Sequence, residues 1–198
     1  PLFYSSGHHI EFTDVHSMLC HRATRAHNTI LVNGMGQRIG TEGYGWIPRY
    51  YASEKIGYVL GDASNAYGKV ISPLWLTRGE QSEVHYTPEN GWDENHVKTF
   101  RRHTVNLGKT GLIFIYDELV ADEPVNWNYL LHTTANPMTV NKSNNRFVHI
   151  QATNRGGASD ADLFSTGTLQ TDTTSRFFYP AVNWLRADDK GVFKKYPN

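Results

Sequence analysis

His27 is the residue of this sequence whose surroundings best suit chemistry, because a polar segment there leads directly into a strand signal. Residues 30–32 (Ile-Leu-Val) are bulky and apolar, as in a buried β-strand, and Asn33-Gly34 after them favours a tight turn. His27 is therefore predicted at the start of a strand, where a fixed backbone holds the imidazole ring in place. A neutral imidazole so placed can bind a metal ion or carry a proton. The alternative is a histidine that caps the strand and hydrogen-bonds to a neighbour.

Ten histidines are present, and half of them fall within the first 27 residues. A zinc site needs three or four ligands in tetrahedral geometry, and the sequence has no close-spaced His-Glu-x-x-His pair. The early histidines could converge if the first residues fold back over the sheet: His8, His9, His16, His21 and His27. The others lie in or beside expected strands, where we expect surface or half-buried residues: His85, His96, His103, His132 and His149.

Strand signals recur at short spacing, which is typical of a β-sandwich, and no long amphipathic helix is indicated. Residues 125–131 alternate between apolar and mostly polar side chains, which predicts a half-buried strand. Residues 112–116 are apolar at every position, which predicts a central strand covered on both faces. The segment 108–111 before it predicts a hairpin turn from a strand at 98–107.

The remaining elements are predicted from shorter patterns. Val148, Ile150 and Ala152 mark another strand, with residues 141–145 as a polar turn in front of it. The stretches 40–51, rich in Gly and Tyr, and 156–174, rich in Asp and Thr, are predicted to be loops. Only residues 14–20 have helix-like spacing, enough for two turns at most.

Composition sets limits on the class of protein. Lysine and arginine (19) balance aspartate and glutamate (19), so neither nucleic acid nor an anionic membrane is indicated as a partner. With 198 residues, the chain can build one sizeable core, and we assign residues 1–198 to a single β-sandwich domain or part of one.

Cys20 is the only cysteine, so no internal disulfide can form. No apolar run approaches the roughly 18 residues that a membrane span needs. Because the chain begins at Pro1 without a signal-peptide pattern, we expect one piece of a longer protein.

Residues 22–37 read Arg-Ala-Thr-Arg-Ala-His-Asn-Thr-Ile-Leu-Val-Asn-Gly-Met-Gly-Gln. This string resembles the start of the C-terminal β domain of the heparinase II/III-like polysaccharide lyases, whose recurrent pattern is R-x-T-x-A-H-N-T, two hydrophobic residues, then V-(N/D)-G-x-G-Q. A second, weaker resemblance lies in residues 100–103 followed by 112–119, where a basic strand precedes a hydrophobic run that ends in Asp-Glu. The sequence is most similar to the heparinase II side of the group, although alginate and oligoalginate lyases carry similar strings.

The resemblance implies a supersandwich-like, antiparallel all-β domain that works with an upstream α-toroid domain of the same protein. It implies β-elimination of a uronic-acid-containing polysaccharide, with a heparin- or heparan sulfate-like glycosaminoglycan favoured over alginate. The implied partner is therefore an anionic polysaccharide, the implied location is the bacterial periplasm or the exterior, and a homodimer is compatible with the family. Two alternatives remain: a noncatalytic carbohydrate-binding β-sandwich, and a structural domain whose histidines only pack.

A lyase of this kind must neutralise the uronate carboxylate, abstract the neighbouring proton and protonate the leaving oxygen. The resemblance implies that the catalytic tyrosine and histidines precede Pro1, so we expect this chain alone to be inactive. Tyr4, Arg25 and Asn28 are nearest in sequence to the implied site, and we expect them to contribute to the substrate cleft.

The resemblance further implies that His27 completes a structural zinc site. The other ligands, a histidine and an aspartate, would lie upstream of Pro1, unless His8, His9 or Asp14 substitutes for them. In the isolated chain the metal could therefore be absent.

Aromatic and basic residues offer further contacts to a polysaccharide. An aromatic face packs well against a pyranose ring, so the candidate platforms are Trp46, Trp75 and Trp92, together with the loop that carries Tyr44, Trp46, Tyr50 and Tyr51. Core packing between two sheets is the competing interpretation for these rings. Two local clusters could attract a polyanion, or could be ordinary solvated faces: Arg22 with Arg25, and Lys98 with Arg101 and Arg102.

Overall fold

The computed structural model describes residues 17–94, 96–133, 138–154 and 156–174, together with the backbone of 184–187 and 193–196. Within this part of the chain the structure is mostly β, and every strand pair is antiparallel, which confirms the predicted all-β antiparallel fold. The strands are β1 (Ile30–Val32), β2 (Trp46–Ala52), β3 (Gly57–Asp62), β4 (Val97–Asn106), β5 (Ile113–Ala121), β6 (Trp127–Tyr129), β7 (Thr139–Asn144), β8 (Phe147–Asn154), β9 (Gly157–Phe164), β10 (Trp184–Ala187) and β11 (Phe193–Tyr196).

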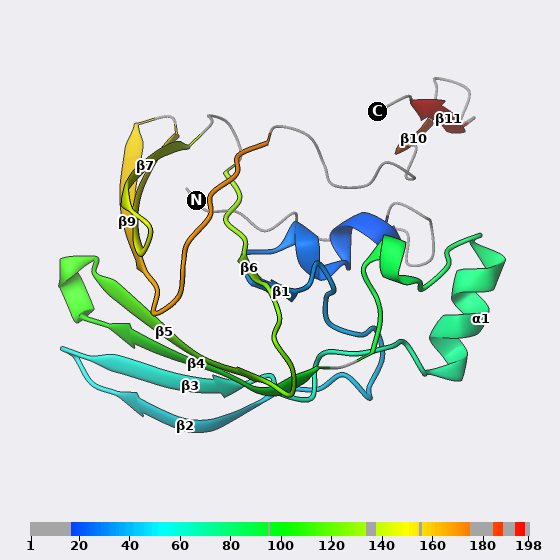
Figure 1. The fold of residues 1–198 in the computed structure, drawn as a ribbon, viewed down its shortest axis with the longest axis horizontal. Helices are drawn as coiled ribbons and strands as arrows, with labels where there is room; N and C mark the ends of the chain where they lie inside the picture. The colour runs from blue at the N-terminus through cyan, green and yellow to red at the C-terminus, as the bar shows by residue number, and fades with distance from the viewer. Residues whose placement is uncertain are drawn as a thin grey trace.

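The main layer is a long curved sheet with the strand order β2-β3-β4-β5, and the pair β1-β6 lies over one end of it (Figure 1). Ile30 and Val32 of β1 are almost fully buried, and they belong to the same apolar cluster as Phe100 of β4. Tyr67 lies in this cluster and donates a hydrogen bond from its hydroxyl to the Ile30 carbonyl at 2.5 Å. Two β layers packed on one core make the fold sandwich-like, and the predicted buried strand at 30–32 is confirmed.

A second core lies beneath the short π-helix η1 (Ser17–His21), on the side of the molecule that carries helix α1 (Pro73–Gln81). Met18 is fully buried here, and Trp92 is only 2 % exposed. The Trp92 ring packs edge-on against Tyr86 and donates a hydrogen bond to the Gln37 carbonyl at 3.0 Å. The prediction of Trp92 as a sugar platform is therefore wrong, because the ring fills the core.

The sheet β7-β8-β9 stands near the end of the curved sheet that is farther from α1 (Figure 1). Val148, Ile150 and Ala152 of β8 are buried, as their spacing predicts. The polar turn expected at 141–145 is wrong, because β7 continues to Asn144 and the turn comes only afterwards. Polar residues can form this strand because most of its side chains whose exposure is described lie at the surface.

The predicted central strand at 112–116 is wrong in its position. Most of these residues belong to β5, which is an edge strand of the curved sheet, and all five side chains are 49 % to 64 % exposed. The turn expected before it is confirmed, since a short 3-10 helix, η4 (Gly108–Thr110), joins β4 to β5. A continuous apolar run thus predicted a strand correctly but not its burial.

Three other expectations need correction. The first expected loop, 40–51, ends in strand β2, and the second, 156–174, contains strand β9. Helix α1 was not expected because it has little apolar periodicity: Leu74 and Leu76 are exposed, and Pro73 at its first turn is the main helix signal. The helix-like segment at 14–20 overlaps η1, although residues before Ser17 lie outside the described part. No helix in the described part of the chain is long and apolar enough to span a bilayer.

Candidate functional site

The two ends of the segment 22–37 are held together by Thr24. Its hydroxyl oxygen accepts a hydrogen bond from the Gln37 backbone N–H at 2.6 Å. A Cβ atom added to Gly36 would lie 2.5 Å from the same oxygen, so only glycine fits beside it. The threonine, the second glycine and the glutamine of this segment therefore have a structural role, which is to close a compact loop around β1.

The turn after β1 is tied to β6 through side-chain amides. Asn33 (φ 52°) and Gly34 (φ 81°) are both left-handed, as a two-residue hairpin turn requires. The Asn33 side-chain oxygen accepts a hydrogen bond from the Asn126 N–H at 2.8 Å, and the Asn128 side-chain oxygen accepts one from the Gly34 N–H at 3.2 Å. These bonds fix the register of β1 against β6.

His27 follows the short 3-10 helix η2 (Thr24–Ala26), in extended backbone. Its ring is half-buried, and Nε2 lies 2.8 Å from the His21 carbonyl oxygen. Because a carbonyl only accepts hydrogen bonds, Nε2 carries the proton, and Nδ1 holds the lone pair of the neutral ring. Metal-binding histidines usually donate their second ring N–H in this way, which fixes both tautomer and orientation.

Asn28 connects the His27 segment to the residues that follow β6. Its side-chain oxygen accepts a hydrogen bond from the His132 backbone N–H at 2.7 Å and lies 3.3 Å from Nδ1 of the His132 ring. The Thr29 carbonyl accepts a further bond from the Leu130 N–H at 2.8 Å. A second imidazole is thereby brought close enough to His27 for the two rings to interact electrostatically.

The His132 ring is half-buried, and this burial lowers its pKa below the usual value. A hydrogen bond to the Arg25 backbone opposes the decrease, and the neighbouring His27 adds to it. His132 is therefore held in the neutral form that metal binding or proton acceptance requires. Sequence reasoning placed it only as a half-buried strand residue, because the pairing of β1 with β6 cannot be read from local patterns.

The predicted cleft residues have different surroundings. Asn28 faces His132, as described, whereas Arg25 is only 9 % exposed and its guanidinium lies close to Gly91. Tyr4 lies outside the described residues, as do the candidate substitute ligands His8, His9 and Asp14.

The donor chemistry around His27 fits part of a zinc site. Two imidazoles, His27 and His132, lie near each other, and each ring contacts a backbone group. Within the described ranges, no three His, Cys, Asp or Glu side chains gather closely enough to hold a metal ion. A complete zinc site would therefore need ligands from outside these ranges.

The aromatic residues expected in a loop are at the surface and do not pack between sheets. Tyr44 and Trp46 are 53 % and 44 % exposed, with ring centroids 5.5 Å apart, and Tyr50 and Tyr51 are exposed on β2. Trp75 is partly buried in the second core, with the Arg22 guanidinium 5.0 Å from its ring centroid.

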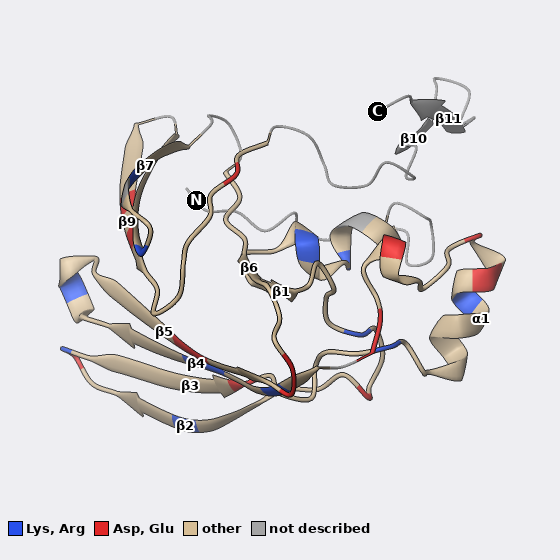
Figure 2. Cartoon of the chain, viewed as in Figure 1, with Lys and Arg blue, Asp and Glu red and all other residues tan. Residues whose placement is uncertain are grey.

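The second predicted basic cluster is mostly paired with acidic residues. Arg102 forms two hydrogen bonds of 2.8 Å to Asp117, and Arg101 forms one of 2.9 Å to Asp62. Figure 2 shows acidic residues close to these basic positions on the curved sheet. Of this cluster, Lys98 is exposed, whereas both arginines are paired with carboxylates of the neighbouring strands.

The other histidines are exposed or half-buried, as expected from their strand positions: His85, His96, His103 and His149. Three of them lie beside carboxylates, and His103 contacts both Tyr58 and Glu118.

No protein-family model matches this chain, and no curated protein matches it either.

Proposed function

We propose that this chain is the β-sandwich portion of a polysaccharide lyase that cleaves a uronic-acid-containing polysaccharide by β-elimination. A heparin- or heparan sulfate-like glycosaminoglycan is the favoured substrate, and alginate or an oligoalginate is the alternative. The catalytic groups belong to an upstream α-toroid domain in this proposal. The part of the chain around His27 lines the cleft and helps to hold a structural zinc ion.

The hydrogen bond from His27 Nε2 to the His21 carbonyl is the observation that carries the proposal. It fixes the plane of the ring, as the hydrogen bond from the second ring N–H of a metal-binding histidine usually does. The other polar residues of the 22–37 segment have evident structural roles, as Thr24 and Asn33 illustrate. The segment 22–37 therefore holds one imidazole in a fixed orientation, which a metal site shared with another domain requires.

Zinc would supply structural cross-linking between this domain and the upstream ligands. This chain's own residues have separate tasks: His27 ligates, Asn28 holds the His132 segment in place, and His132 stays neutral beside it. Arg25 contributes through its backbone, which bonds the His132 ring, and through its guanidinium packing.

The test is zinc content and lyase activity of the full-length parent protein with His27→Ala. We expect loss of the bound zinc and a large decrease in the absorbance signal of the unsaturated uronate product, with heparin, heparan sulfate and alginate as substrates. His85→Ala is the matched control, because His85 is exposed and distant in sequence from the 22–37 segment. Unchanged zinc content in His27→Ala would contradict the metal role.

A noncatalytic carbohydrate-binding domain is the second candidate, favoured by the exposed aromatic residues of β2. It predicts that the parent protein binds the polysaccharide with no turnover. Turnover by the parent protein that depends on His27 excludes it.

A further inference from the structure

The two faces of the curved sheet can be assigned from its register. Phe100 pairs with Leu119, and both pack toward the β1-β6 layer, so the residues that alternate with them point to the outer face. Three rows of paired residues cross that outer face: Tyr51, Tyr58, Val105 and Phe114; Arg49, Leu60, His103 and Tyr116; Asp62, Arg101 and Glu118.

The outer face carries exposed aromatic rings. Tyr51 and Phe114 are each 58 % exposed, and Tyr116 is 64 % exposed. At the same end of the sheet the inner face carries the aliphatic residues Val59, Ile113 and Ile115, together with the ring of Tyr50. Aliphatic surface of this kind suits protein packing, whereas flat exposed rings suit stacking against a pyranose.

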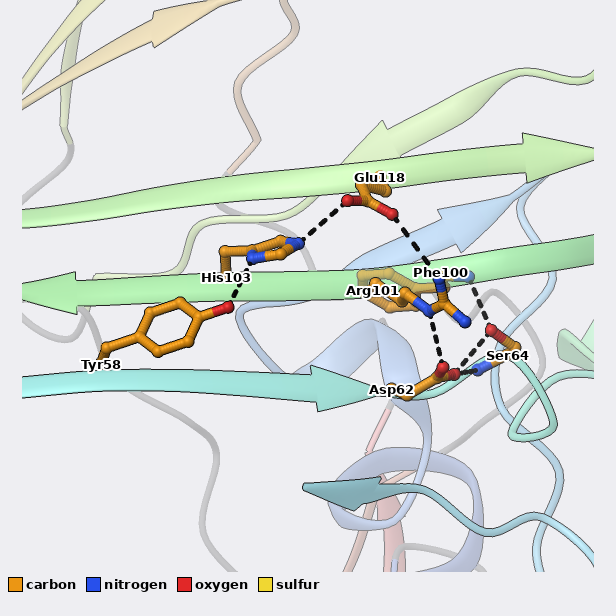
Figure 3. A network of polar contacts seen from close by, with 7 residues as sticks. All are labelled: Tyr58, Asp62, Ser64, Phe100, Arg101, His103 and Glu118. Carbon is orange, nitrogen blue, oxygen red and sulfur yellow. Dashed lines mark hydrogen bonds and ion pairs between the residues drawn. The ribbon is translucent and has the colours of Figure 1, made fainter. Parts of the chain in front are cut away.

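An ordered polar network lies among these rings (Figure 3). His103 accepts a hydrogen bond at Nδ1 from the Tyr58 hydroxyl at 2.9 Å and donates one from Nε2 to Glu118 at 3.0 Å. The Tyr116 ring centroid lies 5.7 Å from that of His103. The imidazole is therefore fixed in orientation between a phenol and a carboxylate.

The network continues to the buried end of β3. The second oxygen of Glu118 lies 4.0 Å from Arg101, whose Nε donates to Asp62 at 2.9 Å. Asp62 is only 4 % exposed, and it also accepts hydrogen bonds from the backbone N–H and the hydroxyl of Ser64. Burial alone would raise the pKa of the Asp62 carboxyl, but the bonds from Arg101 and Ser64 outweigh burial and lower it. The charges at this end are thus fixed in place before any ligand arrives.

We propose that the outer face of β2-β3-β4-β5 is a saccharide-binding platform, separate from the His27 site. Tyr51, Phe114 and Tyr116 stack against pyranose rings. The network around His103 and Arg101 hydrogen-bonds sugar hydroxyl and carboxylate groups, and Arg49, exposed in the same row as His103, adds a positive charge.

The polar network favours a sugar over a protein partner. A dry protein interface would remove water from the phenol, imidazole and carboxylate groups without replacing every hydrogen bond, which costs free energy. A sugar brings hydroxyl groups that can replace the water. The choice of an acidic sugar rests on the proposed function, whereas the platform itself is argued from the sheet.

The test is calorimetric binding of the full 198-residue chain to uronate oligosaccharides from alginate and from heparin, with a neutral gluco-oligosaccharide as a third probe. We expect the acidic oligosaccharides to bind, and Tyr51→Ala with Tyr116→Ala to weaken binding about tenfold, as loss of one or two stacking contacts implies. Tyr50→Ala is the matched control, because Tyr50 is 79 % exposed on the opposite face of the same strand. It should leave the affinity unchanged.

Several outcomes overturn the platform. These are no binding of any of the three probes by the chain, or equal weakening by Tyr50→Ala. Binding of the neutral probe alone would overturn the choice of an acidic sugar. A self-association of the chain that Tyr51→Ala and Tyr116→Ala abolish would assign the face to a protein interface instead. Failure of the proposed function is distinguishable from failure of the platform. A parent protein that keeps its zinc in the His27→Ala variant would contradict the proposed function, but it would leave the calorimetric binding of this chain unchanged.

Discussion

Asn28 and His132 are 104 residues apart in the sequence, yet the Asn28 side-chain oxygen accepts a hydrogen bond from the His132 backbone N–H at 2.7 Å. Asn28 precedes β1 and His132 follows β6, so this bond closes the open end of the β1-β6 pair. One amide therefore stabilises the sandwich and also brings the second imidazole to His27. Fold and candidate site depend on the same contact.

Asn28→Ala should lower the free energy of unfolding by about 1–2 kcal/mol, because it leaves a half-buried N–H without its partner. Urea unfolding measures this change. Asn126→Ala is the control, since the Asn126 side chain is exposed and its backbone N–H, which the substitution keeps, makes the bond to Asn33. Equal losses in the two variants would show that the Asn28 amide has no special role.

Gly36→Ala should destabilise the protein by about 1–3 kcal/mol, because the added Cβ would meet Thr24 at 2.5 Å. Gly61→Ala provides the contrast, since a Cβ there has nothing within 4 Å and its backbone is not left-handed. Thermal unfolding of both variants checks the prediction. A Gly36→Ala protein as stable as the parent would mean that the 22–37 loop can open without loss.

The local part of the fold could be predicted from the sequence. The strand at 30–32 and its turn at Asn33-Gly34 follow from side-chain type and backbone preference alone, which act over a few residues. The same holds for the turn between β4 and β5 and for the buried positions of β8. His27 was predicted at the start of a strand and lies just before β1, directly after η2, and its role stays a prediction.

Long-range relationships could not be predicted. An apolar run such as 112–116 predicts a strand, but its burial depends on which elements cover it, and β5 is an edge. Trp92 and Trp46 have the same side chain, yet one fills the core and the other is exposed, because neighbours distant in sequence decide burial. For the same reason the approach of His132 to Asn28, and of His103 to Tyr58, appeared only in the structure.

His132 should make stability depend on pH in a defined direction. Its pKa is lowered in the folded protein, so the unfolded chain binds a proton at this ring more readily. The stabilisation from the neutral ring is therefore fully present above about pH 6.5 and decreases as the pH falls below that value. When the pH is lowered from above about 6.5 to below it, the His132→Gln variant should lose less free energy of unfolding than the parent. Urea unfolding at one pH above and one pH below that value measures the difference. An NMR titration that places the His132 pKa above its usual value would contradict the prediction.

Asp117→Asn should cost more stability than the removal of an exposed ion pair. Asp117 and Arg102 are joined by two hydrogen bonds, and their side chains are only 11 % and 23 % exposed. Burial disfavours the charge on Arg102, but Asp117 outweighs this and raises the pKa of the guanidinium, which would stay charged and partly buried without its partner. Breaking such a pair costs about 3 kcal/mol at the lower end of the usual range.

Glu94→Gln is the control for this pair, because Lys69 and Glu94 are bonded but both more than half exposed, and we expect little change in the urea midpoint. A double substitution, Arg102→Met with Asp117→Leu, should recover much of the loss, because it removes both charges together. The Arg102 guanidinium carbon also lies 5.6 Å from the ring centroid of Phe100 and 5.5 Å from that of Tyr129, and a methionine side chain can pack against the same rings. A double variant that is less stable than Asp117→Asn would contradict this expectation. It would mean that the ion pair itself stabilises the folded protein, and does not only neutralise two buried charges.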